Sequence, residues 1–143
     1  WQMVGFENGH RALRYLKAHV PGAPPSKLSE FQVDTDRILY SGHSMGGHGA
    51  LMFLTHHGDR ALAGVPNAGW IDFKTYSFDK LRTGDALTDP MLQGVLYASI
   101  SEWDADLYAS NAVGIPLIVR VGGNDTSVPP MELRRWARLV DQE

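Results

Sequence analysis

The stretch Gly42-His43-Ser44-Met45-Gly46-Gly47 places a serine between glycines, and a serine hydroxyl becomes a nucleophile when the fold exposes and activates it. An apolar run over residues 36–41 precedes this stretch, and a helix-like run to about residue 57 follows it. A G-x-S-x-G segment between a strand and a helix is typical of a nucleophile elbow, whose glycines let the two backbones approach closely. We therefore predict that Ser44 is a nucleophile and that the backbone N–H of Met45 is an oxyanion donor.

A candidate acid follows the apolar run Pro116 to Val121, in the loop that ends at Asp125. Functional loops of open parallel sheets lie at the carboxyl ends of strands, and the order serine, acid, histidine is that of one class of catalytic triad. We predict that Asp125 orients a catalytic histidine and stabilises its charged form. The competing interpretation is a turn aspartate that caps the next helix.

The base of such a triad is not evident in the sequence. The expected position is a loop after one further strand, downstream of Asp125. His43 is adjacent to the serine, and its side chain is expected to point away from the hydroxyl, whereas the others are expected to pack or to lie at helix ends. We predict that none acts as the base and that another chain or a missing segment completes the site. All the histidines precede Asp125: His10, His19, His43, His48, His56 and His57.

Composition excludes several classes of function. A net charge of −3 provides no basic surface for nucleic acid or an anionic membrane. The chain has no cysteine, and it has no H-E-x-x-H motif or carboxylate cluster typical of a metal hydrolase, so we predict no metal and no cofactor. No apolar run is long enough to span a membrane. These observations leave the cellular compartment and the oligomeric state open.

The spacing of apolar residues predicts an α/β protein with a mostly parallel sheet and flanking helices. Strands are expected over 36–41, 61–68 and 116–121, with Pro66 ending the paired part of the second strand. The first nine residues are expected to form a loop into a helix capped by Asn8. With only three strands and an exposed edge, we predict that the isolated chain is less stable than an intact enzyme or is held by another chain.

Residues 69–114 are less regular and are predicted to be an insertion or cap over the sheet, between the second and third strands. Thr88-Asp89-Pro90 is typical of a helix start, with a capping residue followed by a proline. The aromatic residues of this segment are expected to pack rather than to contact a ligand. Asp104 and Asp106 are interpreted as a solvated helix face.

Three stretches resemble the catalytic domain of prolyl-oligopeptidase-like serine peptidases, which are α/β-hydrolases: residues 37–50, 111–116 and 122–129. The first also resembles carboxylesterases of the S-formylglutathione hydrolase type. The resemblance implies Ser44 as nucleophile, Asp125 as triad acid and the Met45 N–H as oxyanion donor. The early strands and the catalytic histidine of that family have no counterpart here, so residues 1–143 are expected to be a partial catalytic domain.

The sequence thus predicts a peptidase-like serine hydrolase that cleaves a peptide or a small ester through an acyl intermediate on Ser44. Because the chain is expected to be truncated, it is also expected to be inactive alone. Two alternatives stay open at this point. One is a carboxylesterase of the same fold, and the other is a non-catalytic domain that binds a ligand or a partner.

Overall fold

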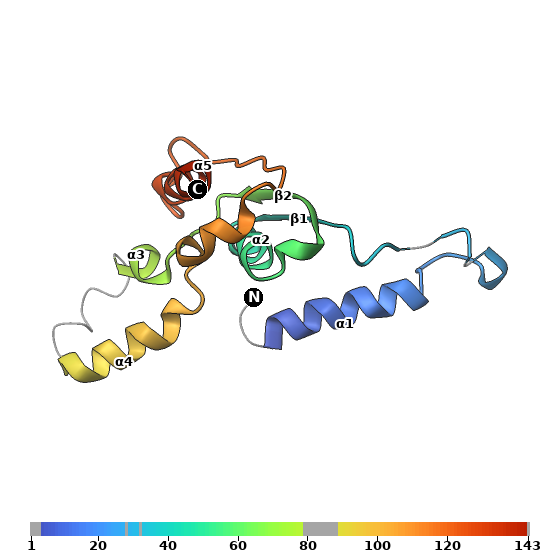
Figure 1. Ribbon diagram of the computed structural model, residues 1–143, viewed down its shortest axis with the longest axis horizontal. Helices are drawn as coiled ribbons and strands as arrows, with labels where there is room; N and C mark the ends of the chain where they lie inside the picture. Colours follow the sequence, from blue (N-terminus) through green and yellow to red (C-terminus); the bar gives the residue numbers. More distant parts are fainter. Residues whose placement is uncertain (1–3, 28, 32, 79–88, 143) are drawn as a thin grey trace.

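A computed structural model describes residues 4–27, 29–31, 33–78 and 89–142. Helices and strands alternate along much of the chain, which is typical of a parallel sheet covered by helices. Figure 1 shows α2 alongside the two strands, with α4 projecting away from them. The elements are α1 (Val4–Ala18), η1 (Pro25–Lys27), β1 (Ile38–His43), α2 (Met45–His56), η2 (Gly58–Arg60), β2 (Ala61–Asn67), α3 (Phe73–Phe78), α4 (Pro90–Ser101), η4 (Ala105–Ala112) and α5 (Met131–Gln142).

The sheet is parallel, with β2 lying between two neighbours in the described part of the chain. On one side β1 pairs with β2 in a register that places His43 opposite Asn67. On the other side residues 116–121 run parallel to β2, and Arg120 forms a bridge to Asn67. The backbone N–H of Ala68 donates to the carbonyl of Arg120 at 2.9 Å. The predicted parallel sheet with flanking helices is confirmed.

Pro66 lies inside β2, which corrects the prediction that it ends the paired region. It is buried and lies opposite Gly42 of β1. Its carbonyl accepts a hydrogen bond from the N–H of Arg120 at 3.2 Å, but proline has no N–H to donate to the carbonyl of Ile118. This missing donor interrupts the ladder, and residues 116–121 consequently pair with β2 through isolated bridges.

Helix α2 covers one face of the sheet and supplies more of the buried core than any other described element. Its side chains from Ala50 to Thr55 are buried, and strand alternation turns Tyr40 toward them, where its ring stacks 5.2 Å from that of Phe53. Gly64 of β2 faces the same helix, and a Cβ there would lie 2.6 Å from Leu54. A side chain at this position of the strand would therefore require the Leu54 side chain to move.

The opposite face of the sheet is open among the described residues. Leu39 of β1 is 57% exposed, and Ile118 of the third strand is 63% exposed. The side chains of a parallel sheet usually pack on both faces. Leu39 and Ile118 are therefore less buried than aliphatic side chains of such a sheet usually are. The predicted low stability of the isolated chain agrees with this exposure but stays a prediction.

Residues 69–114 contain two different kinds of structure. Helix α4 has no buried residue, whereas η4 packs against α2 and contributes Ala105, Ala109 and Ala112 to the core. The predicted helix start is confirmed at Asp89, whose carboxylate accepts hydrogen bonds from the N–H groups of Met91 and Leu92. Residues 79–88, including Thr88, lie outside the described residues. The assignment of 69–114 as one insertion stays a prediction.

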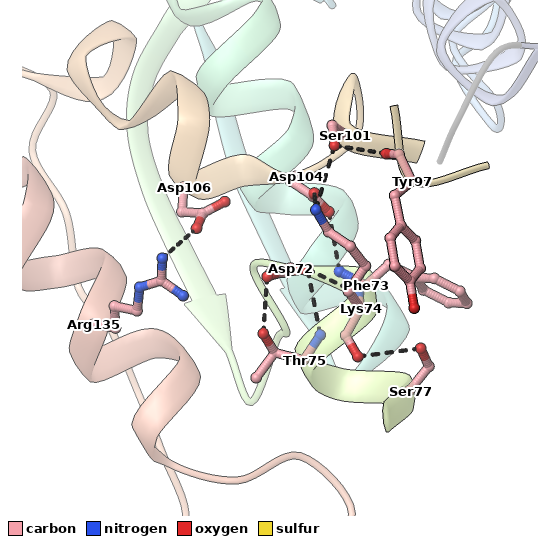
Figure 2. A network of polar contacts seen from close by, with 10 residues as sticks. All are labelled: Asp72, Phe73, Lys74, Thr75, Ser77, Tyr97, Ser101, Asp104, Asp106 and Arg135. Carbon is pink, nitrogen blue, oxygen red and sulfur yellow. Dashed lines mark hydrogen bonds and ion pairs between the residues drawn. The ribbon is translucent and has the colours of Figure 1, made fainter. Parts of the chain in front are cut away.

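Asp104 and Asp106 do not form a solvated face, which corrects the sequence interpretation. The Asp104 side chain is 2% exposed; one oxygen accepts the Phe73 N–H at 3.1 Å, and the other lies 3.5 Å from the Lys74 Nζ. The side chain of Asp106, 8% exposed, accepts a hydrogen bond from Arg135 at 2.7 Å (Figure 2). These partners come from α3 and α5, and their positions are not visible in the local spacing. Burial raises the pKa of both carboxyls.

Helix α1 begins at Val4, which corrects the prediction of a loop before a cap at Asn8. Tertiary contact fixes the early start, because the ring of Phe6 packs edge-on against Phe53 of α2, with centroids 4.9 Å apart. The Glu7 carboxylate also accepts hydrogen bonds at 3.0 and 2.8 Å from two arginines further along the helix. These interactions override the low helix propensity of the glycines in this segment.

Candidate active site

Ser44 occupies the turn between β1 and α2 in a strained backbone conformation, with φ 57° and ψ −118°. A residue with a Cβ adopts such a conformation only where its surroundings impose it. Here the N–H of Ser44 donates to the carbonyl of Asn67 at 3.0 Å, and its own carbonyl accepts the N–H of His48 at 3.0 Å. The turn is thus held from β2 on one side and from α2 on the other.

Glycines at two positions allow this turn to form. A Cβ on Gly42 would overlap the carbonyl of Gly46, and a Cβ on Gly47 would overlap the carbonyl of Asn67. By contrast, a Cβ on Gly46 would meet no atom within 4 Å. The expected close approach of strand and helix therefore depends on Gly42 and Gly47, and the second glycine of the motif is not sterically required by the described residues.

The three parallel segments end at one edge of the sheet, and the predicted site residues lie there. His43, Asn67 and Arg120 are aligned across the strands, so Ser44 follows the end of β1 and the loop with Asp125 follows the end of the third strand, with the end of β2 between them. A pocket of about 440 Å³ opens at this edge. It is lined by His43, Asn67, Ala68, Arg120, Val121, Gly122 and Asp125.

Asp125 lies in the loop before α5, and its carboxylate accepts hydrogen bonds from the backbone of that loop. Its Oδ1 accepts the N–H groups of Ser127 at 2.9 Å and Val128 at 3.0 Å. These hydrogen bonds, first from Val128 and then from Ser127, lower the pKa of the carboxyl, and the nearby charge of His43 acts in the same direction. Because both bonds use Oδ1, Oδ2 accepts no hydrogen bond from the described residues and is available to another donor. The Asp125 carboxylate thus stabilises its own turn, as in the competing interpretation, and its second oxygen can also have another role.

Met45 is the first residue of α2, so its N–H has no acceptor within the helix. Its side chain is 66% exposed. An amide at this position is suited to bind an anionic oxygen beside Ser44. The predicted oxyanion donor thus lies at the start of a helix whose dipole favours negative charge.

The histidines occupy different environments, and only His43 lines the pocket with Asp125 in the described part of the chain. His48 is buried on α2 and stacks on Trp70. His10 and His57 pack against each other at the junction of α1 and α2, with ring centroids 4.5 Å apart. The remaining two, His19 and His56, contact rings of Tyr15 and of Tyr108 and Trp103.

Sequence reasoning did not identify Asn67 and Arg120 as residues of this edge. Both lie at the carboxyl ends of their strands, as Ser44 and Asp125 do, so strand position was the available signal. Arg120 is exposed, and because Val119 and Val121 pack against the core, strand alternation places Arg120 on the face of the sheet opposite α2. Among the described residues, no group of three or more histidines and carboxylates is placed to hold a metal ion, and no helix is long and apolar enough to cross a membrane.

The chain is similar in sequence to known proteins. Residues 26–143 match the prolyl oligopeptidase family. The chain is similar to an uncharacterized secreted protein of Arthroderma benhamiae, with 25% identity over 142 residues that cover 99% of this chain and 15% of the relative. The chain therefore spans about a seventh of the length of that curated relative.

A solved structure shows the same fold. An acylaminoacyl peptidase in complex with Z-Gly-Gly-Phe-chloromethyl ketone is similar to this chain with a TM-score of 0.61 and 25% identity. The match covers 82% of this chain and 19% of the peptidase chain. The fold is a partial α/β-hydrolase fold, as predicted from the sequence.

Proposed function

The chain belongs to the prolyl oligopeptidase family, and we propose that it carries the nucleophile and the triad acid of a serine peptidase site. Ser44 is the nucleophile, Asp125 is the acid, and the Met45 N–H is an oxyanion donor. The observation that carries the proposal is the backbone of Ser44, a residue with a side chain held at φ 57° at the same edge of the sheet as the loop of Asp125. Strain of this kind concentrates at functional sites.

The reaction that fits these groups is acyl transfer. The Oγ of Ser44 attacks the carbonyl carbon of the scissile bond while its proton passes to a base, and the resulting oxyanion accepts a hydrogen bond from the Met45 N–H. The leaving amine takes the proton from the base as the C–N bond breaks. Water then cleaves the acyl ester on Ser44, releases the acid and restores the hydroxyl.

The proposed role of Asp125 requires a carboxylate that stays ionised. Backbone hydrogen bonds lower its pKa, so the group is negatively charged at neutral pH and can stabilise an imidazolium. His43 shares the pocket but is adjacent in sequence to Ser44, and strand alternation turns it toward the face of Arg120. We therefore place the base outside these 143 residues, in a further segment or another chain, and expect low activity from this chain alone.

A peptide is the substrate class that the comparisons favour. The similar acylaminoacyl peptidase was solved with a ligand that contains Gly-Gly-Phe, and the family is one of peptidases. In this proposal residues 1–143 are part of a catalytic domain, with 69–114 as an insertion near the site. A carboxylesterase and a non-catalytic binding domain remain the alternatives, and the experiment below tests the second of them directly.

The test is labelling of the 143-residue chain with a fluorophosphonate, read by intact mass. The serine oxygen forms a bond to phosphorus, fluoride leaves, and the proton passes to a base. Imidazole added to the buffer supplies that base in solution. We expect slow labelling without imidazole and faster labelling with it, both lost in Ser44→Ala. The control is Ser110→Ala, which removes an exposed serine of η4 and should label as the wild type does.

Each outcome bears on a separate part of the proposal. Equal labelling of the wild type and Ser44→Ala, or no labelling even with imidazole, would exclude Ser44 as a competent nucleophile and favour the binding domain. Rapid labelling without imidazole that disappears in His43→Ala would show that the base is His43. For a labelled protein, cleavage of a peptide anilide against a phenyl ester then separates a peptidase from an esterase.

A further inference from the structure

Asn67, the last residue of the central strand β2, lies between the two halves of the proposed site. We propose that it is the positioning residue of the site, because it holds the turn of Ser44 to the end of β2, and β2 pairs on its other side with the strand that leads to Asp125. The inference rests on the proposed function, since positioning affects chemistry only if Ser44 reacts. Asn67 itself is not assigned a contact with the substrate.

Asn67 contacts the turn on both sides of the serine. Its backbone carbonyl accepts the N–H of Ser44 at 3.0 Å. Its side-chain Nδ2 donates to the carbonyl of Gly42 at 3.1 Å and to that of Val65 at 3.0 Å. The same carbonyl oxygen of Asn67 would overlap a Cβ on Gly47. One residue therefore fixes the backbone before, at and after Ser44.

The orientation of the Asn67 amide follows from its partners. Gly42 and Val65 both present carbonyl oxygens, which only accept hydrogen bonds, so the NH₂ group must face them. The Oδ1 is then directed elsewhere, and it is buried with no partner among the described residues. An unpaired buried acceptor is unfavourable, and it persists here because the two donated bonds determine which way the amide points.

The same residue also connects the turn to the strand before Asp125. Asn67 forms the bridge to Arg120, and the next N–H, that of Ala68, donates to the Arg120 carbonyl at 2.9 Å. Asn67 is one of the residues that line the pocket, and Asp125 is another. Any shift at the end of β2 would therefore change the position of Ser44 relative to Asp125, and small displacements of reacting groups lower rates strongly.

The test compares Asn67→Ala with Asn111→Ala. Asn111 is the matched control, because its Nδ2 also donates to a backbone carbonyl, that of Thr55 at 2.8 Å, at a site where η4 meets α2. Two quantities are measured. The first is amide hydrogen exchange of Ser44 relative to that of Gly64. Gly64 lies on β2, as Asn67 does, and its N–H donates to the carbonyl of Pro116. The second is the fluorophosphonate reaction in the presence of imidazole, resolved into a binding constant and a maximal rate.

Asn67→Ala keeps the backbone acceptor of Ser44 and removes only the side-chain bonds. We expect exchange at Ser44 to increase about tenfold relative to Gly64, and the maximal labelling rate to fall about tenfold with the binding constant unchanged. Asn111→Ala should lower the melting temperature and change both ratios by less than about twofold. A loss of stability alone would move all amides together and would not separate Ser44 from Gly64.

Asn67→Asp provides a second variant with a pH readout. A carboxylate oxygen would face the carbonyls of Gly42 and Val65 and be repelled, whereas the protonated acid can donate to one of them. Protection of Ser44 relative to Gly64 should therefore be low at pH 7.5 and recover toward the wild-type value at pH 5. Recovery shows that donation by the side chain positions the turn, even where the alanine variant does not fold.

Two results would overturn the inference. One is wild-type protection of Ser44 and a wild-type labelling rate in Asn67→Ala, and the other is equal losses in Asn67→Ala and Asn111→Ala. Failure of the proposed function looks different, because the wild type would then not label even with imidazole. The exchange ratio would still report whether Asn67 holds the turn.

Discussion

His48 should make this protein sensitive to acid. Its side chain is 3% exposed, and its ring stacks on Trp70 with centroids 4.6 Å apart. Nδ1 lies 3.0 Å from the carbonyl of Trp70, which can only accept, so Nδ1 carries the proton of the neutral ring. Nε2 is buried without a partner among the described residues, and a second proton there would create a buried cation. Burial accordingly lowers the pKa of His48 from 6.5 to about 4.

The sign and size of the effect follow from this shift. The unfolded chain takes up the proton near pH 6.5, whereas the folded protein takes it up only near pH 4. The contribution to stability is therefore complete above pH 6.5, is lost as the pH falls from 6.5 toward 4, and changes no further below that. At pH 4.5 the folded protein should have lost roughly 2 to 3 kcal/mol through this one group.

The assay is urea unfolding at pH 7.5 and pH 4.5 of the wild type and of His48→Asn. The asparagine amide keeps a donor for the Trp70 carbonyl but does not titrate. The difference in unfolding free energy between the two proteins should shift by roughly 2 to 3 kcal/mol in favour of the variant at pH 4.5. Other groups with pKa values shifted in this pH range are common to both proteins and largely cancel: Glu7, His57, Asp104, Asp106, Asp125 and Glu132. The same pH dependence in both proteins would refute the reasoning.

Three other variants test the turn and the buried carboxylates by urea unfolding. Gly47→Ala should cost about 2 kcal/mol or more, because its Cβ would overlap a backbone carbonyl at the end of β2, whereas Gly46→Ala should change stability by less than about 0.5 kcal/mol. Equal costs would contradict the description of the turn. Ser44→Gly should be more stable than Ser44→Ala by about 1 kcal/mol, because glycine relieves the strain at φ 57°; equal stability would mean that the turn stores none. Asp104→Asn should be more stable than the wild type at pH 7.5 and lose that advantage toward pH 3.5, because burial raises the pKa of Asp104. A wild type more stable at pH 7.5 would mean that its ion pair outweighs its burial.

The sequence by itself determined the class of fold and the edge of the sheet where the proposed site lies. An apolar run, a glycine-flanked serine and a helical run are local signals, because each depends on residues within about ten positions of one another. The loop after Pro116 to Val121 could likewise be placed beside the serine, since parallel strands end at the same edge. These signals led to Ser44, Met45 and Asp125 before any contact was known.

The tertiary structure decided which residues support that edge. Asn67 and Gly47 matter because two backbones meet there, 20 residues apart in sequence. Pro66 lies inside β2, although local propensity disfavours proline in a paired strand. The effect of the proline depends on the pairing with the third strand, because that pairing determines which hydrogen-bond donor is lost. Asp104 is buried because its partners lie on another helix. Local spacing reports the direction of a side chain along its own element, but burial and hydrogen bonding depend on what the rest of the chain places opposite it.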